Sequence, residues 1–331
     1  MSKKNILVIY NSTKGFPEYE KSISDQSLEL LRREISSEGF TLALLEVFDD
    51  LESLLAPYSP KDWVVVNWCE QLGDISNSYH LIPPVLEKLS FVYTGAGTHC
   101  LINTQNKASA RDMLLSANAS IPESRVFSSI NDDPEGWNIF PCIVKPSMEH
   151  CSVGITKDSV VDDSEQLAGR IKYVIDEIRS PALVEQFIDG VEYNVPIVGN
   201  GKEAEIYPIS SLEYSYFTDY HQRLCTYDAK WTPGTDEFTK IDIYCPPRAL
   251  YGSLEKRIRE QALLAYNVCY CRDYARIDIR VMNNIPYVLD VNSNPDITYD
   301  GGFYRSCKAK GLSYGQMFLK LCEVAQRRFE Y

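Results

Sequence analysis

Three apolar runs near the start of the chain constrain its fold more than any other feature. The runs NILVIY (5–10), TLALLEVF (41–48) and WVVVNW (63–68) have the length of buried strands. Between the first two, apolar residues of the segment 22–38 fall near one helical face, and Gly39 follows as a stop signal. A strand, a helix and two further strands predict a small parallel α/β unit, because parallel strands need a crossover connection.

The composition excludes several classes of protein. The 331 residues suffice for two or three packed subdomains, and 44% hydrophobic with 24% charged residues is typical of soluble globular proteins. A net charge of −13 argues against a nucleic-acid partner, and no apolar run approaches the ~20 residues of a membrane span. The first apolar run is too short for a signal peptide, and the ten cysteines lack zinc-site spacing. We therefore expect a cytoplasmic protein with reduced thiols and no structural metal.

The remaining elements are predicted by periodicity and turn signals further along the chain. They are a helix and a strand within 82–97, a helix at 105–118, strand pairs with turns within 141–161 and 182–199, a helix at 254–268, strands at 274–282 and 286–292, and a last helix at 313–328. The segment 203–250 is rich in Tyr, Thr and Asp, which predicts short strands and a mobile loop.

The stretch PCIVKPSMEHCSVGI (141–155) places Lys145 at the end of an apolar strand, before a turn-prone loop. The loop carries Ser147, Ser152 and Gly154. A cation beside backbone N–H groups and hydroxyls suits the oxygens of a polyphosphate. A hairpin whose lysine merely faces solvent would give the same pattern, so this segment alone leaves both interpretations open.

The stretch ALVEQFIDGVEYNV (182–195) runs from an apolar strand through Glu185-Gln186-Phe187 to a turn, and Glu192 then begins a new strand. Free backbone groups in a short hinge can bind an adenine edge, and a nearby carboxylate can accept hydrogen bonds from ribose hydroxyls. An ordinary hairpin explains the same residues, and for this segment alone it is the simpler interpretation.

The stretches YARIDIRV (274–281) and IPYVLDVNSNPDI (285–297) predict a hairpin with polar side chains at its end. Asp290 and Asn292 are two residues apart and so share a strand face, on which Asp278 can face them from the partner strand. Two carboxylates and an amide oxygen suit magnesium, which shares its other positions with phosphate oxygens and water. Alternatively Arg276 or Arg280 pairs with Asp278, and both interpretations can hold together.

In this order the stretches resemble the ATP-grasp superfamily and, within it, the D-alanine–D-alanine ligase group. The resemblance runs from about residue 63 to the C-terminus and also includes YTGAG (93–97), NKASAR (106–111), YDAKW (227–231) and DVNSNP (290–295). It implies an α/β (α+β ATP-grasp) fold, with a small N-terminal parallel α/β domain at 1–103 and an ATP-grasp domain at 104–331. Its central (104–188) and C-terminal (189–331) subdomains would clamp ATP between antiparallel sheets.

The resemblance also implies a role for each residue that matches a family motif. The nucleotide-binding set would be Lys107, Lys145 and Ser152 near the phosphates, Glu185, Gln186 and Phe187 at the adenine, Glu192 at the ribose, and Glu149, which would help to close the site. Asp278, Asp290 and Asn292 would hold Mg²⁺ or Mn²⁺, and Arg276 would stabilise the transferring group. Lys230 would come from a mobile loop that closes over the γ-phosphate.

The implied chemistry is ATP-dependent ligation of a carboxylate to an amine. A carboxylate oxygen attacks the γ-phosphate to give an acyl phosphate, and the amine then displaces phosphate to form a C–N bond, with ADP and phosphate released. The expected partners are these two small molecules, with neither nucleic acid nor membrane, and a homodimer is left open.

Departures from the family pattern fall on the substrate side. Glu18 or Glu20 stands where the ligases carry a substrate-binding glutamate, and the other departing positions are Cys151, Trp231, Asp296, Gly301 and Gly302, with Arg305 as a replacement carboxylate ligand. They predict an unusual substrate pair of the natural-product type, for example amino-acid addition to a cyclic acceptor of the mycosporine type. The alternatives are a genuine D-alanine–D-alanine or D-alanine–D-lactate ligase, and a non-catalytic nucleotide-binding protein.

Overall fold

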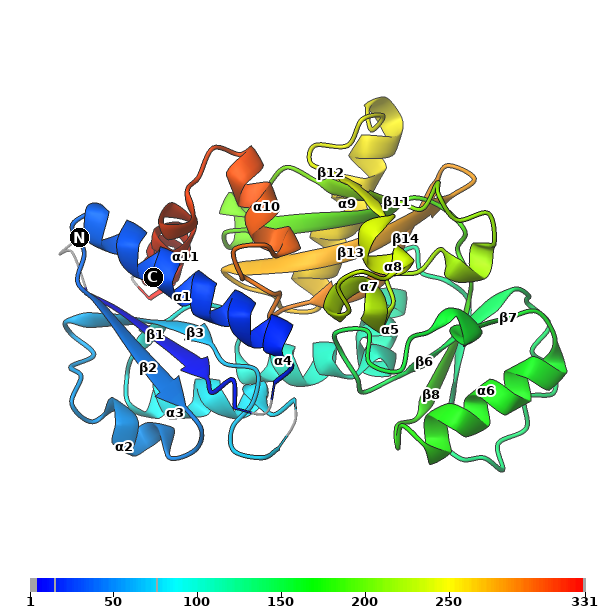
Figure 1. The fold of residues 1–331 in the computed structure, drawn as a ribbon, viewed down its shortest axis with the longest axis horizontal. Helices are drawn as coiled ribbons and strands as arrows, with labels where there is room; N and C mark the ends of the chain where they lie inside the picture. The colour runs from blue at the N-terminus through cyan, green and yellow to red at the C-terminus, as the bar shows by residue number, and fades with distance from the viewer. Residues whose placement is uncertain (1–4, 15, 76, 330–331) are drawn as a thin grey trace.

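The computed structural model describes residues 5–14, 16–75 and 77–329, which form three sheets with helices packed on them (Figure 1). The first sheet is parallel, with strand order β2-β1-β3-β4, and consists of β1 (Asn5–Asn11), β2 (Leu42–Val47), β3 (Trp63–Trp68) and β4 (Val92–Tyr93). The expected N-terminal parallel α/β unit is therefore confirmed.

The continuous apolar character of β1 is explained by helices on both faces of its sheet. Ile6 and Val8 pack toward α1 (Glu18–Ser37) and α11 (Tyr314–Arg328), whereas Leu7 and Ile9 pack toward α2 (Leu51–Leu55) and α3 (Ile82–Lys88). Burying each such side chain contributes roughly 1.5–3 kcal/mol. Because α11 comes from the opposite end of the chain, the two ends of the sequence meet in one layer (Figure 1).

The second sheet is antiparallel and small. Its strand order is β5-β8-β6-β7, formed by β5 (Ser124–Phe127), β8 (Ala182–Gln186), β6 (Cys142–Pro146) and β7 (Val160–Val161). Helix α6 (Ser164–Asp176) covers it and begins after Asp163, whose side chain accepts a hydrogen bond from the Gln166 N–H. The pairing of β6 with β7 confirms the strand pair expected within 141–161.

The third sheet is antiparallel and larger, with order β12-β11-β9-β13-β14 and β10 paired to β9. Its strands are β9 (Glu192–Val198), β10 (Glu205–Ile206), β11 (Ser210–Glu213), β12 (Asp242–Tyr244), β13 (Tyr274–Met282) and β14 (Ile285–Asn292). Helix α9 (Gly252–Val268) packs on it through a core that includes Ile258, Ala262 and Tyr266.

The strand pair expected within 182–199 is wrong. β8 pairs with β5 and β6, whereas β9 pairs with β11 and β13, so each strand has both edges occupied in a different sheet. The residues between them cross from one antiparallel sheet to the other. The hinge interpretation of this segment is therefore the one that fits the topology.

The remaining helices connect the sheets. They are α4 (Thr98–Gln105), α5 (Lys107–Ser116), α7 (Tyr227–Trp231), α8 (Asp236–Thr239) and α10 (Gly302–Ala309), with short 3-10 turns at Tyr79–Leu81, Lys157–Ser159, Gly201–Glu203 and Tyr220–Gln222. Helices α7 and α8 lie in the segment expected to be a mobile loop, and in Figure 1 they lie between the two antiparallel sheets. Phe238 of α8 reaches Tyr19 of α1, with ring centroids 5.8 Å apart.

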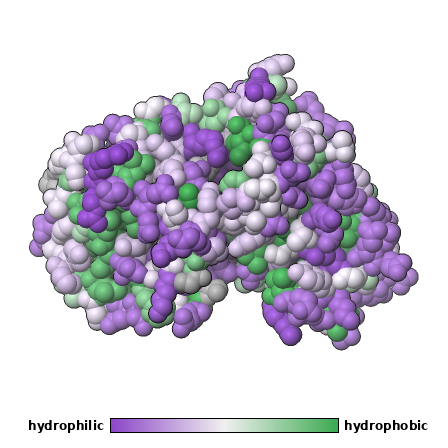
Figure 2. Space-filling view, in the orientation of Figure 1, coloured by the Kyte–Doolittle hydropathy of each residue, from purple (hydrophilic) through white to green (hydrophobic). Residues whose placement is uncertain are grey.

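The surface is mostly hydrophilic on the face drawn in Figure 2, with small separated apolar patches and an indentation between the two lower lobes. No helix in the described ranges is long and apolar enough to cross a membrane.

The domain boundaries at residues 103 and 188 stay a prediction, which is compatible with the ranges of the three sheets.

Candidate active site

A cavity of about 810 Å³ lies where the three sheets approach one another. Its wall gathers every residue to which the family resemblance assigns a site role except Glu18, which is exposed on the first turn of α1, whereas Ser147 and Gly154 of the loop after β6 do not line it. Two residues along a helix turn by about 200°, so Glu18 and Glu20 point to opposite sides. Glu20 lines the cavity. The expectation that Glu18 binds substrate is not supported by the structure.

The β13–β14 hairpin sets the geometry at the centre of this wall. Asn283 and Asn284 form its turn with φ of 51° and 63°, the left-handed conformation that a tight hairpin requires. Counted outward from the turn, a regular ladder would pair Asp278 with Leu289. The ladder shifts between Asp278 and Ile279, so that Asp278 pairs with Asp290 and Arg276 with Asn292. This bulge brings the two carboxylates face to face.

The Asp278 carboxylate is held by four hydrogen bonds. Arg276 donates to both oxygens at 2.7 and 2.8 Å, and the side-chain amides of Asn194 and Asn292 each donate at 2.9 Å. Burial raises the pKa of Asp278, and Arg276 opposes this shift. Of the two arginines considered as partners, Arg276 is therefore the one that pairs with Asp278.

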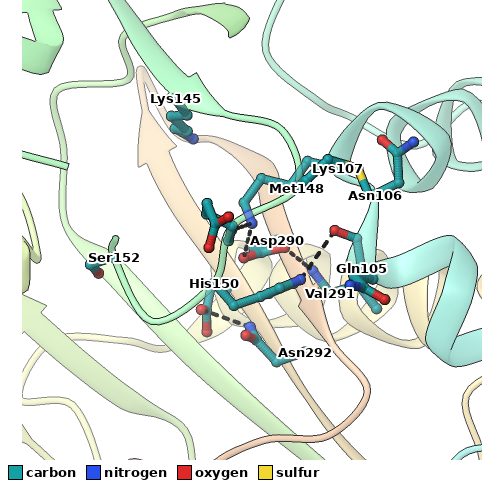
Figure 3. A network of polar contacts seen from close by, with 12 residues as sticks. Gln105, Asn106, Lys107, Lys145, Met148, His150, Ser152, Asp290, Val291 and Asn292 are labelled. Carbon is teal, nitrogen blue, oxygen red and sulfur yellow. Dashed lines mark hydrogen bonds and ion pairs between the residues drawn. The ribbon is translucent and has the colours of Figure 1, made fainter. Parts of the chain in front are cut away.

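Asp290 has fewer partners than Asp278, and its Oδ1 accepts a hydrogen bond from the Val291 N–H at 3.0 Å (Figure 3). Its Oδ2 lies 3.7 Å from Lys107 Nζ, which also donates to the Glu149 carbonyl at 2.6 Å. Burial alone would raise the pKa of Asp290, but Lys107, His150 and Lys145 outweigh burial and hold that pKa below its usual range. Asp290 therefore offers a charged oxygen to the cavity.

The donor set fits a cation that arrives with a phosphate ligand. In the part of the chain that the structure describes, no three His, Cys, Asp or Glu side chains cluster as a complete metal site. Asp278 and Asp290 provide two carboxylates, and Asn292 would add its amide oxygen after a 180° rotation of that amide. Magnesium usually fills its other positions with water and phosphate oxygens.

Lys107 is positioned by the start of α5. The side chain of Asn106 accepts hydrogen bonds from the N–H groups of Ala108 and Ser109 and so caps the helix immediately before Lys107. His150 approaches the preceding helix, with Nε2 3.1 Å from the Gln105 carbonyl. Burial and nearby Lys107 lower the pKa of His150 to about 4, so this imidazole adds no charge beside the lysine at neutral pH.

Lys145 and Glu185 form an ion pair across β6 and β8, with 2.5 Å between Nζ and Oε2. Both side chains are largely buried, at 15% and 7% exposure. Glu185 therefore positions Lys145, and the following residues Gln186 and Phe187 line the cavity beyond it.

The loop after β6 is tied to the segment that carries α7. Cys151 and Ser152 have φ of 53° and 64°, an uncommon conformation for residues other than glycine. Ser152 Oγ donates to the Cys225 carbonyl at 2.7 Å, and Trp231 Nε1 donates to the Cys151 carbonyl at 3.3 Å. Lys230 beside Trp231 lines the cavity, and among the described residues its ammonium group has no hydrogen bond or ion pair.

Glu192 is held by Arg280, a residue to which sequence reasoning gave no site role. Arg280 Nε donates to Glu192 at 3.0 Å, and the Tyr214 hydroxyl donates to the same oxygen at 3.1 Å. Arg280 also donates to the Ile188 carbonyl in the hinge, at 3.2 Å. Its signal in the sequence was the alternation of Arg276, Asp278 and Arg280 on one strand face.

A second missed residue is Glu70, which follows β3 at the carboxyl end of the parallel sheet. Its N–H donates to Asn11 Oδ1 at 2.6 Å, and its side chain reaches the same cavity as Glu20 and Asp296. Glu70 is itself exposed to solvent, but desolvation by the protein around its carboxyl, with repulsion from Asp296 and Glu20, raises its pKa from 4.5 to about 7. These three carboxyls make the cavity acidic at this end.

Replacing Glu70 with glutamine should stabilise the ligand-free protein more at pH 8 than at pH 5. A carboxyl whose pKa is raised on folding favours the folded state at low pH, and this contribution is lost as the pH rises from 4.5 through about 7. Glutamine stays neutral throughout. Melting temperatures of both proteins at the two pH values measure the effect, with Glu18→Gln as the control outside the cavity. If the melting temperatures of the wild type and Glu70→Gln differed by the same amount at both pH values, the proposed repulsion among the carboxyls would be contradicted.

Comparisons with known proteins agree with this geometry. The family model described as D-ala D-ala ligase C-terminus matches residues 118–323, more than half of the chain. The D-alanine–D-alanine ligase of Desulforudis audaxviator is 28% identical over 248 residues, covering 74% of this chain and 76% of that protein. An uncharacterized protein of Sinorhizobium fredii, y4sG, is 26% identical over 253 residues, covering 75% of this chain and 70% of that protein.

Solved structures show the same fold. The D-alanine–D-alanine ligase from Bacillus anthracis complexed with ATP superposes with a TM-score of 0.74 at 19% identity, covering 98% of both chains. The VanG D-Ala:D-Ser ligase from Enterococcus faecalis has a TM-score of 0.73 at 21% identity, covering 98% of this chain and all of that one. The chain therefore belongs to the D-alanine–D-alanine ligase family of ATP-grasp enzymes and is an ATP-dependent ligase that forms a C–N bond.

Proposed function

We propose that this ligase activates a carboxylate as an acyl phosphate and couples it to an amine, with an amino acid as one substrate, and that the pair is not two D-alanines. The observation that carries the proposal is the acidic end of the cavity, which is lined by Glu20, Glu70 and Asp296. Amino-acid addition to a cyclic acceptor of the mycosporine type is one reaction of this class.

The nucleotide end of the cavity supports ATP as the phosphoryl donor. In our proposal Lys107 and Lys145 contact its phosphates, the hinge at Gln186 and Phe187 contacts adenine, and Glu192 contacts ribose. The proposed Mg²⁺ on Asp278 and Asp290 would offset phosphate charge during transfer. Lys230, which has no described partner, is free to reach the γ-phosphate, and Arg276 lies beside the transferring group.

The substrate end is ill suited to the carboxylate of a second D-alanine. The Asp296 carboxylate accepts hydrogen bonds from the Thr298 N–H and hydroxyl at 2.8 and 2.7 Å, so it is fixed as an acceptor facing the cavity. A carboxylate next to it meets like charge. The same geometry attracts the ammonium group of an amine substrate.

The two glycines at this end differ in what they can accommodate. A Cβ on Gly301 would lie 2.9 Å from Asp296 Oδ2, closer than real contacts allow, whereas a Cβ on Gly302 would come no nearer than 3.7 Å to Asn194. Position 302 therefore has room for a serine hydroxyl, and position 301 does not. The second candidate is a genuine D-alanine–D-alanine ligase. It is favoured by the position of Arg305 in the cavity wall, where its guanidinium could bind the carboxylate of a second D-alanine.

The purified enzyme should use its best amine at least ~100-fold more efficiently than D-alanine, because a buried carboxylate short of donors costs several kcal/mol. Phosphate release against a panel of amino acids and amines, with products identified by mass, measures kcat/KM for each pair. Gly302→Ser should improve D-alanine use, and Gly301→Ser should not. Efficient D-alanyl-D-alanine synthesis, with millimolar or better affinity at both subsites, would overturn the proposal.

A further inference from the structure

Two cysteines from distant parts of the chain are in direct contact outside the cavity. Cys100 lies in α4, Cys271 lies between α9 and β13, and their Sγ atoms are 3.8 Å apart although 171 positions separate them in sequence. Cys100 is 2% exposed, whereas Cys271 is only half-buried. Neither residue has a role in the proposed ligation.

The surroundings favour reaction between these two thiols. A disulfide needs an Sγ–Sγ distance of about 2.05 Å, so the atoms must approach by roughly 1.8 Å. Cys271 lies outside helices and strands, and its N–H donates to the Tyr266 carbonyl at 2.9 Å, so most of the approach must come from rotation of the two side chains. The hydrogen bond with Cys271, aided by Ser293 and Arg272, lowers the pKa of Cys100 despite burial, and the same contact raises the pKa of Cys271. The thiolate is the nucleophile in thiol–disulfide chemistry.

We propose that Cys100 and Cys271 are an oxidation site that forms a reversible intramolecular disulfide when the enzyme meets a peroxide. Cys271, the more exposed of the two thiols, loses its proton and attacks the peroxide, whose O–O bond breaks to leave a sulfenic acid on Cys271 and one water. The Cys100 thiolate then attacks Cys271 Sγ, the S–S bond forms, and hydroxide leaves and takes up a proton. Overall two thiols lose two electrons and two protons, and one peroxide becomes two waters.

The bridge would join two parts of the cavity wall. One turn beyond Cys100, the hydroxyl of Thr104 contacts Ser293 Oγ at 2.6 Å, and Ser293 directly follows Asn292. Oxidation would covalently link α4 to the start of β13 and close a loop of about 170 residues. Closing so long a loop restricts the unfolded chain, and we expect the melting temperature to rise by about 5 °C.

The test treats the reduced full-length enzyme with a small excess of hydrogen peroxide and maps its peptides by mass spectrometry without reduction. We expect a cross-linked peptide pair containing Cys100 and Cys271, a loss of about 2 Da, the rise in melting temperature, and reversal of all three by a thiol reductant. The variants Cys100→Ser and Cys271→Ser should each lack the cross-linked peptide, the mass loss and the rise in melting temperature. If one variant does not fold, the other still tests the proposal.

The matched control is Cys245→Ser. Cys245 is also half-buried, but its Sγ contacts the Pro208 carbonyl and Ser306 Oγ instead of a thiol. This variant should cross-link as the wild type does. The proposal is overturned if the oxidised wild type keeps Cys100 as a free thiol, or if Cys271 accumulates only as sulfinic acid.

Discussion

Replacing Asp290 with asparagine should lower turnover roughly 1000-fold and leave the fold almost unchanged. The proposed metal contributes several kcal/mol to phosphoryl transfer, and each 1.36 kcal/mol is tenfold in rate. Asn keeps the size of Asp and relieves repulsion with Asp278, which faces Asp290 across the hairpin. Steady-state phosphate release and the dependence of ATP binding on magnesium concentration measure the two consequences.

Asp242→Asn is the matched control, because Asp242 is an exposed aspartate on β12 of the same sheet. It should keep wild-type turnover and magnesium dependence. An Asp290→Asn protein whose ATP binding still tightens with magnesium as in the wild type would rule out the metal role. A melting temperature far below that of the wild type would instead show that Asp290 is needed for folding.

Removing the Lys145 ammonium should weaken ATP binding roughly 10- to 100-fold, because a charge-assisted contact contributes about 1.5–3 kcal/mol. The ion pair with Glu185 complicates the simple substitution. Lys145→Met leaves a nearly buried carboxylate without its partner, which costs about 3–5 kcal/mol of folding stability. Loss of ATP binding in that variant could therefore reflect partial unfolding.

The double variant Lys145→Met/Glu185→Gln separates these effects, since it removes both charges together. It should melt near the wild-type temperature and still bind ATP weakly. Glu185→Gln alone is the reference, so that any contribution of Glu185 to adenine binding cancels. Isothermal calorimetry with ATP gives both affinities. If the double variant and Glu185→Gln bind ATP equally well, Lys145 does not contact the phosphates.

Much of the fold could be predicted from the sequence because it depends on neighbouring residues. The apolar runs of β1, β2 and β3 indicate burial on both faces of their sheet, and Asn283-Asn284 indicates a tight turn. Many of the motif residues were also readable, because they lie at the end of a strand or beside a turn. One cavity is lined by every residue to which the resemblance assigns a site role except Glu18.

The register of strand pairing could not be predicted from the sequence alone. A regular hairpin from the Asn283-Asn284 turn would place Leu289 opposite Asp278, and only the bulge places Asp290 there. The separation of β8 and β9 into different sheets is similar, because an apolar strand followed by a turn looks the same in a hairpin and in a crossing.

Contacts between distant segments were decided by the tertiary structure alone. Local periodicity carries no signal that α11 closes the N-terminal sheet, that Glu70 meets Glu20 and Asp296, or that Cys100 touches Cys271. The sequence by itself determined which strands are buried and which polar residues share a strand or helix face, since those depend on periods of two and 3.6 residues. The acidity of the substrate end required the three-dimensional fold, because electrostatic repulsion depends on distance in space and not on separation along the chain.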